Sequence, residues 1–188
     1  AITPKTKAIV PVHLFGQCCD MEPLLALAKK YHLFVIEDAC QSVGATYTFS
    51  DGSSLKAGTM GDIGCTSFFP SKNLGCYGDG GALFTNDDAL AQKMRGIVNH
   101  GMFTRYYHDM VGVNSRLDSI QAAVLQVKLK YLTHYNEARN EVAQFYNHFF
   151  KNHKNITIPI LSPFSTHVFH QYTLQLKNVN RQKLIEKM

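Results

Sequence analysis

The sequence has 188 residues, of which 45% are hydrophobic and 18% charged, and its formal net charge is +5. This length allows one sizeable domain with a core of its own, and no apolar run is long enough to span a membrane. The basic residues are scattered, and only Lys29 and Lys30 are adjacent, which argues against a nucleic-acid-binding surface.

The cysteines and histidines give little support to a disulfide framework or a metal site. The five cysteines are an odd number, and Cys18 and Cys19 are adjacent. No CxxC or HExxH pattern occurs, so we expect no bound metal. Reduced thiols and a cytoplasmic location are the plain expectation.

The first forty residues predict a strand, a helix and a second strand. The apolar run Lys7–Leu14 predicts a buried strand, and Asp20 is expected to cap a helix over Met21–Tyr31. Leu33–Ile36 predicts the next buried strand, which runs into Asp38. A strand–helix–strand unit of this length implies parallel strands, and functional residues of parallel sheets gather at the carboxyl ends. Asp38 is at such an end.

The middle of the chain predicts two further strands and a helix. We expect Tyr47–Met60 to be a loop or an exposed hairpin and Cys65–Phe69 to be a buried strand. Gly81–Thr85 is expected to be another strand. Asp88–Asn99 is expected to be a helix capped by Asn86-Asp87, and Gly101–Val113 is expected to be a loop.

The longest helical pattern follows in the last third of the chain. Asn114-Ser115 is expected to cap a helix that runs to about Lys130 and, after a break near Thr133, continues to about Phe150. Residues 151–166 are expected to form a connector, and Val168–Leu176 is expected to form a strand. Asn180 is expected to cap a final helix that reaches Met188. The chain starts without an initiator Met and stops in mid-pattern, so we expect a piece of a longer protein.

One lysine stands out for its position. Lys72 follows the apolar strand end Phe68-Phe69 and Pro70, in a segment dense with glycine. Partial desolvation there would favour a neutral, nucleophilic amine, whereas the alternative is a surface lysine in a turn. Asp38 and Lys72 both follow strand ends, and a pyridoxal phosphate enzyme needs a lysine for a Schiff base and an acid for the pyridinium nitrogen. The alternative for Asp38 is the cap of a turn.

Several motifs in fixed order are similar to one enzyme family. The blocks are Val12–Gln17, Glu37–Ala45, Gly61-Asp62, Ser67–Gly75, Tyr77–Gly81 and Gly112–Ala123. Together they resemble the DegT/StrS family of sugar aminotransferases, over about Lys7–Tyr172. The resemblance implies part of the fold-type I large domain of pyridoxal phosphate enzymes, an α/β unit with a mostly parallel sheet flanked by helices. This domain would cover residues 1–130, and residues 131–188 would be a linking helix and the start of a small α+β domain.

The resemblance also implies roles for residues around the cofactor pyridoxal 5'-phosphate. Lys72 would hold the cofactor as a Schiff base and, once released, move the substrate proton. Asp38 would pair with the pyridinium nitrogen, and Gln41 would lie against the ring or its phenolic oxygen. Ser67 would donate to the phosphate, and Asn114 would reach the phosphate of the neighbouring subunit of a homodimer.

Four further residues are candidates for substrate binding by the same resemblance. Arg116 would help to hold the anionic nucleotide-sugar, with a surface ion pair to Asp118 as the alternative. His170 or Tyr172 would lie near the substrate, although a lone histidine beside an apolar strand is more often structural. His13 would line the pocket or merely finish a strand.

The family activity implied is transfer of an amino group, from glutamate, to a keto group of a nucleotide-linked sugar for surface polysaccharides such as O-antigen. Within this resemblance, the motif that runs from His108-Asp109 to Asp118 favours 3-keto over 4-keto substrates. One alternative is a sugar dehydratase of the same family, which has a histidine in place of the lysine. Another is a non-catalytic or regulatory module. The family's N-terminal phosphate-binding loop is absent before Val12, so we expect this chain alone to bind cofactor poorly.

Overall fold

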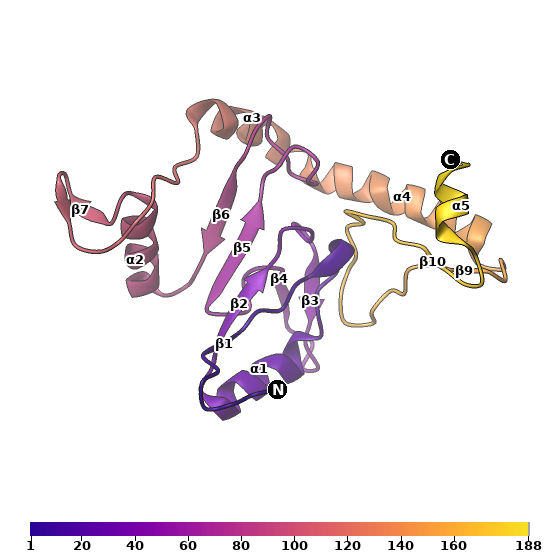
Figure 1. The fold of residues 1–188 in the computed structure, drawn as a ribbon, viewed down its shortest axis with the longest axis horizontal. Helices are drawn as coiled ribbons and strands as arrows, with labels where there is room; N and C mark the ends of the chain where they lie inside the picture. Colours follow the sequence, from indigo (N-terminus) through magenta and orange to yellow (C-terminus); the bar gives the residue numbers. More distant parts are fainter. Residues whose placement is uncertain (188) are drawn as a thin grey trace.

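A sheet of four strands in the order β1-β2-β5-β6 forms the centre of the computed structural model, which describes residues 1–187 (Figure 1). The strands are Ala8–Ile9 (β1), Phe34–Asp38 (β2), Ile63–Ser67 (β5) and Gly81–Phe84 (β6). β2 is parallel to both β1 and β5, and only β6 is antiparallel to its neighbour. The predicted α/β class with a mostly parallel sheet is therefore confirmed.

The helices of the first half of the chain lie beside this sheet, and those near the C-terminus lead away from it (Figure 1). The helices are Met21–Tyr31 (α1), Asp88–Val98 (α2), Ser119–Leu129 (α3), Leu132–Phe150 (α4) and Arg181–Ile185 (α5), with a 3₁₀ turn at Leu14–Gly16 (η1). The bounds predicted for α1 are confirmed, and so is a break in the long helical pattern, which falls at Lys130-Tyr131. The side chains of Asp87 and Asn180 accept hydrogen bonds from the first turns of α2 and α5, as predicted.

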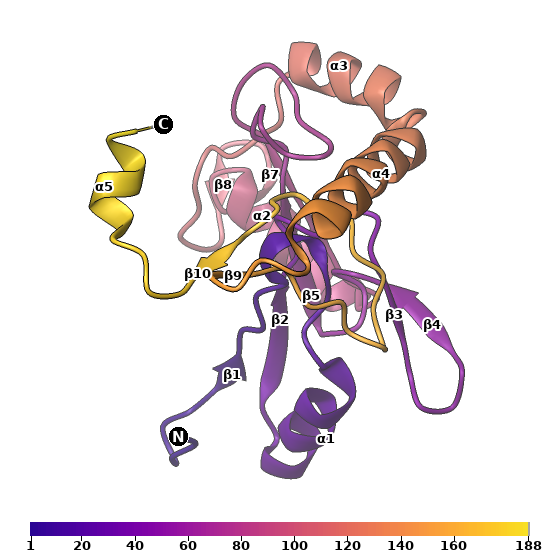
Figure 2. The same cartoon turned by 90° about the vertical axis from the view of Figure 1, so that its right-hand side faces the viewer.

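Three pairs of short antiparallel strands lie outside the main sheet. Their strands are Thr46–Thr48 (β3), Ser54–Lys56 (β4), Met102–Thr104 (β7), Tyr107–His108 (β8), Ile156–Thr157 (β9) and Gln175–Leu176 (β10). The pairs β3–β4 and β7–β8 are hairpins. The β3–β4 hairpin projects from the body of the molecule (Figure 2) and matches one of the two predicted forms. The prediction of a loop over Gly101–Val113 is wrong. Left-handed φ values at Gly101 and Tyr106 permit a tight hairpin that leaves no hydrophobic period.

Two predicted strands are much shorter than expected. Lys7–Leu14 keeps only β1 and an isolated bridge from Val12 to Asp38, because Pro11 has no N–H to donate to a ladder. Of the predicted strand Val168–Leu176 only β10 is formed. Phe169 has a φ of 42°, which no strand residue adopts, so the chain turns there.

Of two further predicted helix caps, one is confirmed in position only and the other is wrong. Asp20 is the N-cap residue of α1, but its side chain makes no cap bond, and its Oδ1 instead accepts a hydrogen bond from the hydroxyl of Tyr47 at 2.7 Å. α3 begins at Ser119 with Asp118 as the preceding residue, whereas Asn114 forms a bridge with Asn99. The apolar pattern that begins at Leu117 thus starts before the helix does.

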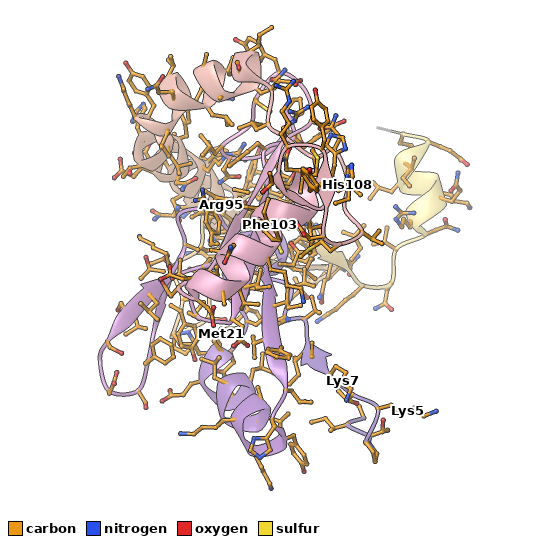
Figure 3. All side chains as sticks on the ribbon, turned by 90° about the vertical axis from the view of Figure 1, so that its left-hand side faces the viewer. Lys5, Lys7, Met21, Arg95, Phe103 and His108 are labelled. Carbon is orange, nitrogen blue, oxygen red and sulfur yellow. The ribbon has the colours of Figure 1, made fainter. Side chains whose placement is uncertain are left out.

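The core has two parts. The larger cluster joins α1, β2 and the segment between β2 and β5 to Val168 from the distant C-terminal part; it comprises Cys18, Met21, Ala28, Val35, Ala39, Ala45, Tyr47, Ala57 and Val168. The smaller cluster of Leu74, Cys76 and Leu125 packs the turn after β5 against α3. Phe103, labelled in Figure 3, covers Gly96 of α2. Within residues 1–187 no helix has the length and apolar character needed to cross a membrane.

Candidate functional site

Asp38 and Ser67 end two neighbouring parallel strands at the same edge of the sheet. Asp38 is the last residue of β2 and is paired in register with Cys65 of β5, and Ser67 ends β5. The N–H of Asp38 donates to Pro11 O at 2.9 Å, and its carbonyl accepts from His13 N at 3.0 Å. The backbone that carries the carboxylate is therefore held against the 11–13 segment on one side of β2.

The carboxylate of Asp38 is half-buried and only partly used by the protein. Its Oδ1 accepts a hydrogen bond from Cys40 N at 3.1 Å. No donor among residues 1–187 reaches Oδ2 within hydrogen-bonding distance. One carboxylate oxygen is thus available for a positively charged or N–H group.

Lys72 lies in a turn that follows β5. Its N–H donates to Phe69 O at 2.9 Å, and its side chain is half-buried. The thiol of Cys40 is near enough to respond to both Asp38 and Lys72. Burial, and then the hydrogen bond and charge of Asp38, raise the pKa of Cys40 to about 12, while the charge of Lys72 opposes this rise. Both charges thus act on the Cys40 thiol, in opposite directions.

Two neighbouring side chains keep donors available. Ser67 Oγ accepts from Phe69 N at 3.2 Å, which leaves its hydroxyl proton free to donate. Gln41 Oε1 accepts from Phe15 N at 2.7 Å, so its NH₂ group points elsewhere. Phe15 has a left-handed φ of 61°, and this turn brings its N–H to Gln41.

Lys72 lines a hollow of about 710 Å³ together with His170 and Tyr172. The other lining residues are Pro70, Ser71, Asn73, Lys128, Tyr135, Ala138, Arg139, Val142, Ala143, Tyr146 and Phe169. We call this space, between the turn after β5, α4 and residues 169–172, the Lys72 hollow. Tyr172 donates its hydroxyl to Asn147 Oδ1 at 2.7 Å. Burial first, and then the charges of Lys72 and Arg139, lower the pKa of His170.

His13 is placed inside the protein and away from this hollow. Its side chain is 0% exposed, and its Nε2 is 2.9 Å from Glu37 Oε2. Its Nδ1 accepts from Cys19 N at 3.1 Å. Since one ring nitrogen accepts an N–H, the other carries the proton and donates to Glu37.

Asn114 and Arg116 lie at a second hollow, of about 1050 Å³, between β6, α2 and the segment before α3. Arg116 Nε donates to Asn114 Oδ1 at 3.1 Å. In the part of the chain that the structure describes, Arg116 makes no ion pair with Asp118. Asn114 and Arg116 therefore line a different hollow from Lys72, and Asp38, Gln41 and Ser67 line neither of the two.

Sequence reasoning missed the buried polar residues that support the site. Asn73 is 7% exposed and Asn136 8%, and they are hydrogen-bonded to each other at 2.7 Å. Glu37 is also completely buried. The position of Asn73 next to Lys72 was the only signal, because its partner lies far away in the sequence.

Comparisons with known proteins match this chain to one family of aminotransferases. A sequence model of the DegT/DnrJ/EryC1/StrS aminotransferase family matches residues 1–188. The chain is 49% identical over 178 residues to UDP-2-acetamido-2-deoxy-3-oxo-D-glucuronate aminotransferase of Pseudomonas aeruginosa, covering 95% of this chain and 48% of that protein. It is 47% identical to UDP-N-acetyl-3-dehydro-alpha-D-glucosamine 3-aminotransferase of Acidithiobacillus ferrooxidans, with 94% and 46% covered.

A solved structure with the same fold is DesV of S. venezuelae in complex with a ketimine intermediate. It superposes with a TM-score of 0.88 at 40% identity and covers 97% of this chain and 47% of that one. The chain thus spans about half the length of the relatives that it matches.

Proposed function

The chain belongs to the DegT/DnrJ/EryC1/StrS aminotransferase family, and on that basis we propose that it carries the cofactor-holding residues of a nucleotide-sugar aminotransferase. The observation that supports this most is that Asp38 and Ser67 end neighbouring strands at one edge of the sheet, with Lys72 in the turn that follows β5. Lys72 supports a transaminase over a dehydratase of the same family, in which a histidine replaces the lysine.

The donor set at this edge fits pyridoxal 5'-phosphate. A primary amine, a carboxylate with one unpaired oxygen, a free hydroxyl proton and a free amide NH₂ lie on Lys72, Asp38, Ser67 and Gln41. When bound, this cofactor accepts the electrons of a substrate carbanion. The unpaired oxygen of Asp38 suits the ring nitrogen, the hydroxyl of Ser67 suits the phosphate, and the Gln41 amide suits the ring face or phenolic oxygen.

Lys72 has two roles in the proposal. Its Nζ would hold the cofactor covalently through the aldehyde carbon, and its amine would move the proton at the reacting substrate carbon. Asp38 keeps the ring nitrogen protonated by its charge. His170 and Tyr172 line the same hollow as Lys72, so they are the substrate-contacting candidates. His13 is buried against Glu37 and has a structural role at the sheet edge in this proposal.

The substrate class is a nucleotide-linked 3-keto sugar, with glutamate as the amino donor. Two similar relatives are named for a 3-oxo and a 3-dehydro UDP-sugar, which supports the 3-keto over the 4-keto alternative. The product belongs to the amino sugars that cells build into surface polysaccharides such as O-antigen.

The active site is shared between two subunits of a homodimer in this proposal. Asn114 and Arg116 lie at a hollow that does not include Lys72, so they are free to serve the site of a second copy. Asn114 would bind the cofactor phosphate there and Arg116 the anionic nucleotide-sugar. The enzyme works in the cytoplasm, consistent with cysteines that are all free.

The test uses the whole gene product that contains this sequence. After loading with pyridoxal phosphate and reduction with borohydride, mass spectrometry should find a pyridoxyl group on Lys72 and none on a Lys72→Arg variant. With glutamate and a UDP-linked 3-keto sugar, the enzyme should release 2-oxoglutarate and the 3-amino sugar. No label on Lys72, or a dehydrated sugar as product, would contradict the proposal.

A further inference from the structure

Asn73, the residue after Lys72, uses every polar atom of its side chain inside the protein. Its Nδ2 donates to Asn136 Oδ1 at 2.7 Å and to Val168 O at 2.9 Å. Its Oδ1 lies 3.3 Å from His170 Nδ1. The side chain is 7% exposed, so water does not compete for these bonds.

The partners determine which way the Asn73 amide points. The carbonyl of Val168 can only accept a hydrogen bond, so the amide atom beside it has to be Nδ2. The remaining atom, Oδ1, then faces the ring of His170 and can only accept. His170 Nδ1 therefore has to carry a proton.

The charge state of His170 determines which of its two ring nitrogens carries a proton. Burial and the positive charges of Lys72 and Arg139 lower the pKa of His170, so the ring is neutral at neutral pH. A neutral imidazole has one proton, and here it is on Nδ1. Nε2 is consequently an unprotonated acceptor, and no donor within residues 1–187 is bonded to it.

The segment that carries His170 is held in place as well. Arg139 of α4 donates through Nη1 to Phe169 O at 3.1 Å and to His170 O at 3.3 Å. Asn136, from the same helix, donates to Val43 O at 3.2 Å. Through Asn136, the Asn73 amide thus connects the Lys72 turn to the segment that follows Gln41.

We propose that Asn73 is a positioning residue that holds His170 in its Nδ1–H tautomer, so that Nε2 accepts a hydrogen bond from an O–H or N–H group of the substrate in the Lys72 hollow. The use of Nε2 for substrate rests on the proposed function. The tautomer itself does not, because it follows from contacts within the chain. A substrate hydroxyl is the matching donor for such an acceptor, since sugars carry many hydroxyls.

The test is the ¹⁵N NMR spectrum of the His170 ring in the whole gene product without substrate. We expect a protonated-type shift for Nδ1 and an unprotonated-type shift for Nε2. In Asn73→Leu, which has no acceptor, the proton should move largely to Nε2. The matched control is Asn140→Leu, because Asn140 donates to Asn136 O and His167 O and has no hydrogen bond to Asn73 or His170. It should leave the tautomer unchanged.

Asn73→Asp is the second variant and keeps the inference testable if Asn73→Leu does not fold. A carboxylate still accepts from Nδ1, and its charge should raise the pKa of His170 by about one unit or more. An Nε2–H ring in the unaltered protein, an unchanged tautomer in Asn73→Leu, or an unchanged His170 pKa in Asn73→Asp would each overturn the inference. Borohydride labelling of Lys72 in the same samples reports on the proposed function separately.

Discussion

Glu37 Oε2 accepts a hydrogen bond from His13 Nε2 at 2.9 Å, and both side chains are 0% exposed. Three backbone N–H groups of the 58–61 loop donate to the same carboxylate. The next residue, Asp38, points to the other face of the strand and keeps an oxygen without a partner among the described residues. The two adjacent carboxylates therefore differ, because Glu37 holds the sheet edge together whereas Asp38 keeps one oxygen available for the proposed cofactor.

We expect Glu37→Gln to lower the free energy of unfolding by about 3 kcal/mol, because the amide can no longer accept all these hydrogen bonds in a site without water. Urea denaturation measures the change. Glu141→Gln, at an exposed position of α4, is the control and should stay within about 0.5 kcal/mol of the unaltered protein. Equal effects of the two substitutions would contradict the structural role of Glu37.

The same carboxylate makes stability depend on pH. Burial alone would raise the pKa of Glu37, but the hydrogen bonds from His13 and the 58–61 loop outweigh burial and lower it. Glu37 therefore contributes stability that is fully present above its unfolded pKa of about 4.3 and is lost as the pH falls through the lower folded pKa. Denaturation between pH 7 and pH 3 should show this loss in the unaltered protein and a smaller slope in Glu37→Gln. Identical slopes would argue against it.

Gly64 in β5 leaves no room for a side chain. A Cβ added there would overlap the backbone of Gly58, whereas at Gly52 nothing lies within 4 Å. We expect Gly64→Ala to destabilise the protein by about 3 kcal/mol through overpacking. Gly52→Ala should cost about 1 kcal/mol, because only its positive φ of 85° is unfavourable. Thermal and urea unfolding distinguish the two, and a larger loss for Gly52→Ala would contradict this packing.

The sequence predicted the elements whose signals are local. The stripe of α1, the cap at Asp87 and the β-branched run before Asp38 are patterns of near neighbours, so α1, α2 and β2 could be anticipated. The prediction of a strand over residues 168–176 is mostly wrong, because hydrogen bonds to residues far away in the sequence determine the backbone conformation there. Val168 N donates to Gly16 O at 2.7 Å, and this contact, together with Arg139, imposes a turn on an apolar run.

In the candidate site, too, residues with a local sequence signal could be predicted and residues that depend on distant partners could not. Lys72 and Asp38 could be selected because they follow strand ends and stand in distinctive motifs. The bonds of Asn73 could not be anticipated, since its partners are 63, 95 and 97 residues away along the chain. A buried asparagine has no periodicity of its own, and only the folded chain shows which acceptors surround it.

The substitution Asp38→Asn should separate cofactor attachment from catalysis. The amide side chain is nearly isosteric with the carboxylate and could still accept from Cys40 N, but it has no charge to keep the ring nitrogen protonated. We expect amino transfer from glutamate to slow by about 10²-fold or more, whereas borohydride still labels Lys72. Asp51→Asn, at the exposed tip of the β3–β4 hairpin, is the control and should keep the full rate. An unchanged rate in Asp38→Asn would remove this residue from the mechanism.

A shared active site can be tested by mixing two inactive variants. Lys72→Ala removes the attachment point in its own subunit, and Arg116→Ala removes the residue proposed to serve the other subunit. A heterodimer of the two has one intact site, which combines Lys72 of one chain with Arg116 of the other.

Random reassortment of these subunits makes about half of the dimers mixed, so about one quarter of the sites should be active. The measurement is the rate of 2-oxoglutarate release after mild dissociation and reassociation, with each variant treated alone as the control. If Lys72 and Arg116 instead serve the same subunit, every site in the mixture lacks one of them and the mixture stays inactive. Recovered activity therefore requires that Arg116 acts across the interface, as its separation from the Lys72 hollow leads us to expect.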